Sequence, residues 1–251
     1  MRKLHIINLE KMGGVERLFL QYIQDVTTNQ DCIFCISNQI GPEIAQHLTG
    51  RKVTFVNRIL NNYPIKFPPF LRKYALQTKT WLANPEAIIV WDLVPVFVAK
   101  PTRGKVIYYD HGCSWRYPHN KKTMNFFAAL DGTISASYAS KRVMELRFNL
   151  SCPSQVLINR ILPPANIFTG DKPLTAPLRL GIAARLVGLK GISVALLTLK
   201  NLLDRGINVT LDIAGKGPDE HQFIQLAQKL GIAGNVNFLG FRDDLSDFFN
   251  S

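Results

Sequence analysis

Two basic residues, Arg185 and Lys190, stand in the short break between an apolar strand pattern and the apolar helix expected at residues 192–204. Gly188 and Gly191 lie in the same break and give the backbone room to approach a ligand. An anion at this place would meet two charge-assisted donors and the positive end of the helix dipole. A diphosphate fits such a site. The structural alternative is a pair of solvated charges that flank a buried helix.

Two loops in the first half of the chain carry residues suited to ligand contact. Gly13 and Gly14 follow the first expected strand and precede a helix whose first turn bears Glu16. His111 follows the strand expected at residues 105–110 in the same way. Open parallel sheets bind ligands at the carboxyl ends of their strands, so both loops are candidate ligand contacts. The structural alternatives are an ordinary glycine turn and a histidine that satisfies a core amide.

The sequence lacks the common motifs that wrap phosphates. The break around Lys190 has no G-x-x-x-x-G-K-[ST] spacing, and no G-x-G-x-x-G follows the first expected strand. Cys32 and Cys35 form a C-x-x-C pair, but they lie inside an apolar strand pattern. A redox pair begins a helix and a zinc site needs a second pair, so we interpret both as core cysteines.

Short apolar strand patterns alternate with helical patterns almost from end to end, which predicts an α/β fold whose parallel sheets are covered on both faces. Strands are expected at residues 3–9, 32–37, 52–57, 87–92, 105–110, 132–137, 154–159, 178–184, 208–215 and 235–241. Helices are expected at residues 15–26, 42–48, 121–130, 138–148, 192–204 and 219–230, with another beginning near residue 243.

A polar stretch at residues 161–177 interrupts this alternation with four prolines and a glycine, which is typical of a linker. We therefore expect a first domain at residues 1–160 and a second at residues 178–251. The second domain is expected to be incomplete, because it has three strand patterns and sheets of this class usually have about five.

Composition indicates a globular protein, with 47% hydrophobic and 19% charged residues. No apolar run reaches the roughly 20 residues of a membrane-spanning helix, and the first residues read as a strand instead of a signal peptide, so we expect a cytoplasmic protein.

Residues 1–170 hold 21 Lys and Arg against 10 Asp and Glu, so the net charge of +12 belongs mainly to the first part. Nucleic acid, anionic lipid or a phosphorylated saccharide would each be attracted by this charge, and a solubilising surface is the alternative.

Five fragments in order resemble one family. "GGVERL" at residues 13–18 and "DHG" at 110–112 come first, followed by "ARLVGLKG" at 184–191, "LDIAGKGPDE" at 211–220 and "NVNFLGFRDDLSDFF" at 235–249. Together they resemble the retaining glycosyltransferases of family 4, which use nucleotide-sugars and have the GT-B fold of two Rossmann-like parallel-sheet domains. The resemblance implies a nucleotide diphosphate-sugar donor as substrate, with no cofactor and no metal, in keeping with the absence of a D-x-D pair.

The resemblance also implies roles for particular residues. Arg185 and Lys190 would stabilise charge on the distal phosphate as the glycosidic bond breaks, and His111 would face the transferred sugar. The nucleotide and its phosphates would lie along the backbone of glycine-containing loops and of the last strand, whereas acceptor contacts would come from the first domain. The implied donor contacts are Gly13, Gly14, Gly215, Gly217, Phe238 and Leu239, and the acceptor contacts are Glu16 and Arg116. For the second-domain residues, a strand-to-helix turn and a buried strand are the alternatives.

The sequence departs from the family pattern at two places. Arg160 occupies an interdomain position where the family usually has glycine, and the paired glutamates that the family carries beyond the base-binding strand do not occur before Ser251.

The leading hypothesis is a bacterial glycosyltransferase that moves a hexose to a saccharide or lipid-linked acceptor of lipopolysaccharide or another surface polysaccharide. An anionic membrane surface is a further expected partner, at which the protein would be peripheral. The alternatives are an inactive nucleotide-sugar-binding remnant or fragment and, on charge alone, a nucleic-acid-binding protein; no aromatic-basic motif supports specific nucleic-acid binding.

Overall fold

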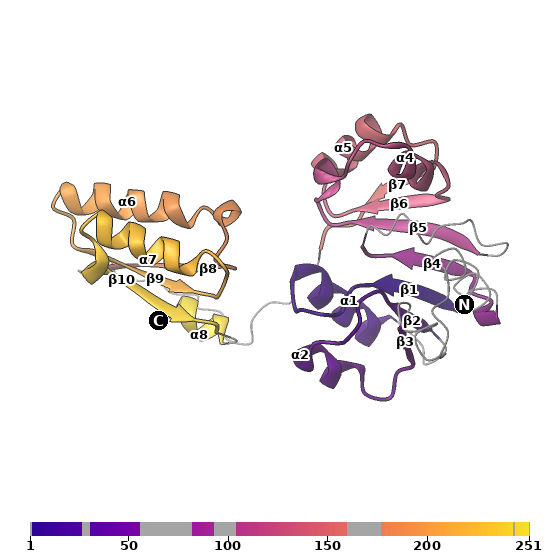
Figure 1. The fold of residues 1–251 in the computed structure, drawn as a ribbon, viewed down its shortest axis with the longest axis horizontal. Helices are drawn as coiled ribbons and strands as arrows, with labels where there is room; N and C mark the ends of the chain where they lie inside the picture. Colours follow the sequence, from indigo (N-terminus) through magenta and orange to yellow (C-terminus); the bar gives the residue numbers. More distant parts are fainter. Residues whose placement is uncertain are drawn as a thin grey trace, which may run out of the picture. The chain divides into compact units, whose positions relative to one another are not determined.

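The computed structural model describes residues 2–26, 31–55, 82–92, 104–159, 177–242 and 244–250. The chain divides into two compact units, Met1–Arg160 and Ile161–Ser251. Of the expected linker, only Pro177 falls within the described residues. Each unit is described by itself below (Figure 1).

The first unit contains, within the described residues, a seven-stranded parallel sheet in the order β3-β2-β1-β4-β5-β6-β7. Its strands are β1 (Lys3–Ile7), β2 (Cys32–Cys35), β3 (Val53–Phe55), β4 (Ala87–Val90), β5 (Lys105–Asp110), β6 (Gly132–Ser135) and β7 (Ser154–Val156). Its helices are α1 (Gly14–Asp25), α2 (Pro42–Ala45), α4 (Lys121–Ala128) and α5 (Tyr138–Phe148), with the short 3-10 helices η1 (Gln46–Leu48) and η2 (Ser114–Arg116).

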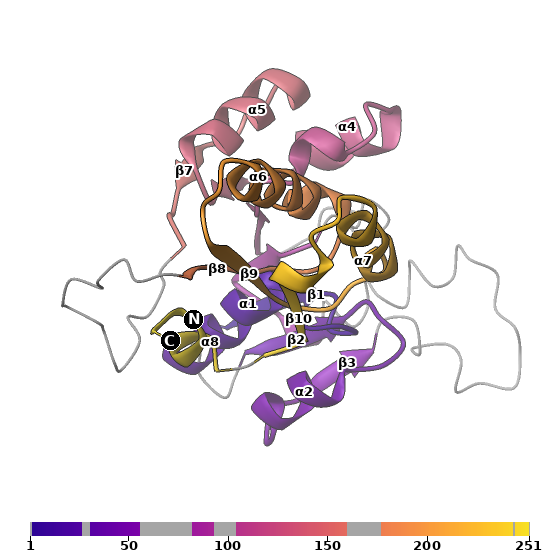
Figure 2. The same ribbon diagram turned by 90° about the vertical axis from the view of Figure 1, so that its left-hand side faces the viewer.

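Alternate side chains of the central strands enter two separate cores, one on each face of this sheet. In β1, Leu4 and Ile6 pack with α4 and α5, whereas Ile7 packs with α1 and α2. The same alternation separates Ile88 from Ile89 in β4. In Figures 1 and 2, α4 and α5 lie beside β6 and β7, while α2 lies beside β2 and β3. The expected parallel sheet covered on both faces is thus confirmed for this unit, because successive strand residues point to opposite faces and both faces are apolar.

The second unit contains, in its described part, a three-stranded parallel sheet in the order β10-β9-β8. Its elements are β8 (Leu178–Ala183), β9 (Val209–Ala214), β10 (Val236–Gly240), α6 (Ile192–Asp204), α7 (Glu220–Lys229), α8 (Leu245–Asn250), η3 (Gly188–Lys190) and η4 (Ala233–Asn235). Figure 1 shows α6 and α7 on one face of the sheet and α8 on the other. Buried apolar residues such as Leu196, Leu211 and Phe223 form the core under α6 and α7.

The opposite face of this second sheet is partly polar. Arg179 Nη2 lies 2.8 Å from one carboxylate oxygen of Asp212, and Asn237 Nδ2 donates to the other at 2.7 Å. Burial raises the pKa of Asp212, but the hydrogen bonds from Arg179 and Asn237 outweigh it and leave the pKa below its ordinary value. Phe248 of α8 packs beside Gly181, where an added Cβ would lie 3.2 Å from the ring. The buried carboxylate of Asp212 and the Phe248 ring thus both contribute to this face.

The cysteine prediction is confirmed, because Cys35 is buried, Cys32 is partly buried and packed against the core, and both are free thiols. None of the described helices is long and apolar enough to cross a membrane. Every strand and helix expected from the sequence occurs within the described residues, and no end is displaced by more than three residues.

Candidate functional site

The loop between β8 and α6 presents both predicted cations to solvent. Arg185 follows the end of β8, Lys190 closes the 3-10 helix η3, and both side chains are exposed. Among the residues that the structure describes, neither side chain has an ion pair or a hydrogen bond. Gly191 begins α6 with a φ of 71° and has no side chain to cap the helix. Two unpaired cations therefore lie in the loop that leads into a 13-residue helix, an arrangement that favours an anion.

Backbone hydrogen bonds tie the ends of the three strands of this unit to one another. Leu186 N donates to Lys216 O at 3.1 Å, which joins the loop after β8 to the loop after β9. Gly215 N donates to Gly240 O at 2.7 Å, which joins the loop after β9 to the end of β10. These bonds place the two cations, the glycines after β9 and the end of β10 on one connected edge of the sheet.

Gly215 and Gly217 permit this close approach. A Cβ at Gly215 would lie 1.9 Å from the carbonyl oxygen of Ala184, and one at Gly217 would lie 2.1 Å from that of Leu186. Gly215 also has a φ of +145°, which L side chains rarely adopt. The close contact between the loops after β8 and β9 therefore explains why glycine occupies both positions.

Phe238 and Leu239 differ in their surroundings. The Phe238 side chain packs against the core under α6 and α7, whereas Leu239 is 39% exposed. The pairing of β10 with β9 shifts register between Phe238 and Gly240. A ligand at this strand end would therefore meet backbone and Leu239, and not the aromatic ring.

In the first unit, Glu16 turns back onto the glycine pair. Gly13 is the N-cap of α1, and a Cβ built there would lie 2.6 Å from Glu16 Oε2, while Gly14 has open space around it. Burial raises the pKa of Glu16, and the charge of Asp92 raises it further, against hydrogen bonds from the backbone of Glu16 and Gly13. The carboxylate thus satisfies a free amide of the helix start, as the glutamate of a capping box does.

Asp92 lies at the carboxyl end of β4, beside the end of β1, and the sequence analysis did not identify it as a site residue. It follows β4, and its Oδ2 accepts a hydrogen bond of 2.7 Å from the backbone N–H of Asn8, which follows the neighbouring strand β1. Burial raises the pKa of Asp92, and the bond from Asn8 opposes that shift. Its place at the end of "AIIVWD" is the signal that could have found it, because β4 ends at the same edge as β1.

His111 lies in an aromatic stack at the end of β5. Its ring is 4.4 Å from the ring centroid of Tyr109 and 5.6 Å from that of Trp91. Burial lowers the pKa of His111 to about 4, so the imidazole is neutral near pH 7. Neither ring nitrogen has a hydrogen-bond partner among the described residues. Both nitrogens are also buried, so the neutral imidazole keeps two unsatisfied polar atoms at the end of β5, which suits hydrogen bonding better than charge stabilisation.

Arg116 lies beyond this turn in η2. It is exposed, and its guanidinium lies 4.7 Å from the ring centroid of the exposed Trp115. Asp110, which is fully buried, accepts hydrogen bonds from Gly112 N at 3.3 Å and from Ser114 Oγ at 3.4 Å. The turn that carries His111 and leads to Arg116 is therefore fastened to the end of β5. Within the described ranges, no group of three or more His, Cys, Asp and Glu could hold a metal ion.

Solved structures similar to this chain identify its fold. HepE from Anabaena in complex with UDP-glucose matches with a TM-score of 0.69 and 16% sequence identity, over 99% of this chain and 71% of that one. The apo form of the lipopolysaccharide outer core galactosyltransferase WaaB matches with a TM-score of 0.65 and 18% identity, over 100% of this chain and 71% of that one. The chain has the GT-B fold.

Sequence comparison places a family domain in the second unit of this GT-B chain. Residues 172–251 match the family described as "Glycosyl transferases group 1". Protein CapJ of Staphylococcus aureus is 36% identical over 59 residues, which is 24% of this chain. That match spans only 15% of the length of CapJ. Arg185, Lys190, Gly215 and Gly217 all fall inside the matched family domain.

Proposed function

We propose that this GT-B protein is a retaining glycosyltransferase that moves a hexose from a nucleoside diphosphate-sugar to a saccharide or lipid-linked acceptor. The observation that supports this most is the pair of unpaired cations, Arg185 and Lys190, in the loop between β8 and α6 and within the residues that match the group 1 family. The proposed pathway is the synthesis of bacterial lipopolysaccharide or another surface polysaccharide. The lipopolysaccharide outer core galactosyltransferase WaaB supports that pathway, and HepE, in complex with UDP-glucose, supports a nucleotide-sugar donor.

The proposed reaction breaks the bond between the anomeric carbon of the sugar and the diphosphate oxygen, and forms a bond from that carbon to an acceptor hydroxyl oxygen. The hydroxyl proton leaves with the diphosphate, on which negative charge develops as the bond breaks. Arg185 and Lys190 contact the phosphates and stabilise that charge more in the transition state than in the ground state. His111, neutral at pH 7, accepts or donates a hydrogen bond to a hydroxyl of the transferred sugar. No metal or other cofactor enters this scheme.

In this proposal, Gly13, Gly14, Gly215 and Gly217 let backbone lie near the donor, and the end of β10 at Phe238 and Leu239 lies along its base. Glu16 and Arg116 contact the acceptor, with Trp115 as an aromatic surface for a sugar ring.

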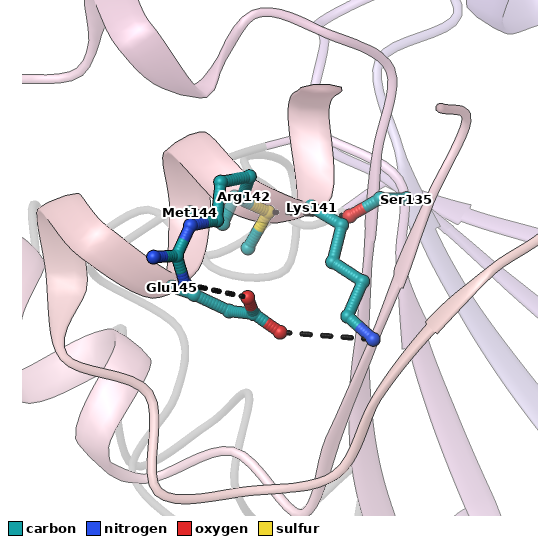
Figure 3. A network of polar contacts seen from close by, with 5 residues as sticks. All are labelled: Ser135, Lys141, Arg142, Met144 and Glu145. Carbon is teal, nitrogen blue, oxygen red and sulfur yellow. Dashed lines mark hydrogen bonds and ion pairs between the residues drawn. The ribbon is translucent and has the colours of Figure 1, made fainter. Parts of the chain in front are cut away.

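The basic first unit supports an acceptor that is anionic or held at an anionic membrane. On α5, Lys141 and Arg142 both reach the single carboxylate of Glu145, at 3.7 and 3.8 Å, as Figure 3 shows. Two cations share one anion there, so a net positive charge remains. We propose a cytoplasmic protein that associates peripherally with anionic lipid through this charge.

Nucleotide titration tests the donor site. The Arg185→Ala and Lys190→Ala variants should each bind the preferred nucleoside diphosphate, chosen from UDP, GDP and ADP on the wild type, about tenfold or more weakly, because each removes a charge-assisted contact. Arg205→Ala, which removes an exposed cation beyond the other end of α6, is the matched control and should bind as the wild type does. Unchanged affinity in both site variants would contradict the proposal.

Donor hydrolysis and sugar transfer should be measured separately from binding on the same protein. Binding accompanied by transfer supports the glycosyltransferase. Binding with neither hydrolysis nor transfer would instead favour a nucleotide-sugar-binding protein without catalytic activity.

A further inference from the structure

Asp219 occupies the N-cap position of α7, but its side chain does not cap the helix. An aspartate at the N-cap position usually accepts a hydrogen bond from an amide in the first turn of its own helix. Asp219 makes no such side-chain bond. Its Oδ2 instead accepts a hydrogen bond of 2.9 Å from the backbone N–H of Gly188, 31 residues earlier in the chain. The carboxylate therefore binds the loop between β8 and α6 and makes no hydrogen bond to the first turn of α7.

The bond from Gly188 fixes the part of that loop that carries both cations. Gly188 is the first residue of η3, whose last residue is Lys190, and Lys190 N donates to Val187 O at 2.9 Å. The first amides of a helical turn have no partner inside the turn, so Asp219 supplies the missing acceptor for η3.

Backbone contacts of Asp219 reinforce this attachment on the other side of the loop. Asp219 N donates to Leu186 O at 3.2 Å, and Leu186 N donates to Lys216 O at 3.1 Å. The Leu186 side chain is fully buried, which anchors the residue next to Arg185 in the core. The loop is thus held at Leu186 and at Gly188, in both cases through the segment that ends at Asp219.

We propose that Asp219 is a positioning residue, whose carboxylate holds Arg185 and Lys190 in the arrangement that binds the diphosphate of the donor. This inference rests on the proposed function. Without the carboxylate, the start of η3 is free to fray, and binding of a diphosphate then has to order the loop first. The role belongs to the hydrogen-bond acceptor and not to the negative charge, since a charge of this sign beside the cations weakens the attraction of an anion.

Three variants distinguish the acceptor from the charge. Asp219→Ala removes both, Asp219→Asn keeps an oxygen acceptor, and Glu220→Ala removes a carboxylate one position later as the matched control. Asp219→Ala should bind the preferred nucleoside diphosphate about fivefold more weakly, while its affinity for the corresponding monophosphate falls less than about twofold. Asp219→Asn and Glu220→Ala should bind both nucleotides within about twofold of the wild type. Equal losses for the two nucleotides, or a loss in Asp219→Asn as large as in Asp219→Ala, would overturn the inference.

A combined variant checks that Asp219 acts through the cations. In a protein that already carries Arg185→Ala and Lys190→Ala, adding Asp219→Ala should change diphosphate affinity less than about twofold, because the groups it positions are gone. A further fivefold loss would overturn the inference.

Amide hydrogen exchange separates a failure of this inference from a failure of the proposed function. Asp219→Ala should speed exchange at Gly188 by at least about fivefold, with no change in Asp219→Asn or Glu220→Ala. Unchanged exchange at Gly188 would overturn the inference alone. A wild-type protein that binds no nucleoside diphosphate would overturn the proposed function and, with it, the assignment of the held loop to donor binding.

Discussion

The buried His5 and the partly buried His111 predict how the first unit responds to acid. His5 has no exposed surface, and its Nδ1 accepts a hydrogen bond of 3.2 Å from Trp91 Nε1. Burial lowers the pKa of His5 to about 4, against the attraction of Asp31, and burial lowers that of His111 to about 4 as well. Both side chains are therefore neutral in the folded protein at pH values where they would be protonated in the unfolded chain.

The free energy of unfolding should fall as pH drops from 6.5 to 4, because the unfolded state binds more protons than the folded state across that range. Above pH 6.5 the histidines are neutral in both states and cost no stability. Between pH 6.5 and 4, His5 alone should lower the free energy of unfolding by up to about 3 kcal/mol. Urea unfolding at pH 7 and at pH 4.5 measures this decrease.

The His5→Phe variant should lose less stability between those two pH values than the wild type. His47→Gln, which changes an exposed histidine of the same unit, should keep the wild-type difference. Equal pH dependence in the wild type and His5→Phe would contradict this explanation.

At the scale of elements, the close approach of the loops after β8 and β9 depends on glycine. Gly217→Ala should lower the free energy of unfolding by about 2 kcal/mol or more, because the new Cβ would lie 2.1 Å from the backbone carbonyl of Leu186. Backbone cannot move aside as a flexible side chain can. Chemical denaturation followed by circular dichroism provides the measurement.

Gly234→Ala is the control for that prediction. Gly234 lies in η4 of the same unit, and an added Cβ there would meet nothing within 4 Å. The control should unfold within about 0.5 kcal/mol of the wild type. Similar losses in both variants would indicate that glycine content, and not loop contact, determines stability here.

The elements themselves were predictable because each is a local pattern. Apolar runs of strand length predicted β8 and β9, and apolar residues at helical spacing predicted α6, each almost to the residue. The same patterns placed Arg185 and Lys190 between β8 and α6. The contacts that arrange the site join residues far apart in the sequence and leave no local signal. Asp219 is the N-cap residue of α7, and its carboxylate binds Gly188 instead of an amide of its own helix. Asp92 interrupted an apolar run, and only the pairing of β4 with β1 brings it to Asn8.

At the scale of the whole molecule, the uneven charge predicts where anionic lipid would bind. Lys121 and Lys122 are exposed at the start of α4 in the basic first unit. Replacing both with glutamate should weaken binding to vesicles that contain anionic lipid by about tenfold or more at low salt, since each basic residue near such a surface contributes about 1 kcal/mol. Vesicle sedimentation measures the change.

The matched control places the same charge reversal in the second unit. Arg205 and Lys229 are exposed there, and replacing both with glutamate gives the same change in net charge. This variant should bind vesicles more tightly than the first one. Equal weakening would show that net charge alone governs binding, and no binding by the wild type at low salt would contradict the membrane proposal.

The hydrogen bonds that join the three strand ends of the second unit have a consequence for ligand size. Leu186 is tied to Lys216 and Gly215 to Gly240, so the separation between the cation loop and the end of β10 is set before any ligand arrives. A molecule that touches both places must bridge a fixed gap. For the donor proposed above, a compound with one phosphate fewer or more would lose one of the two contacts, so we expect these backbone hydrogen bonds to select ligands by length.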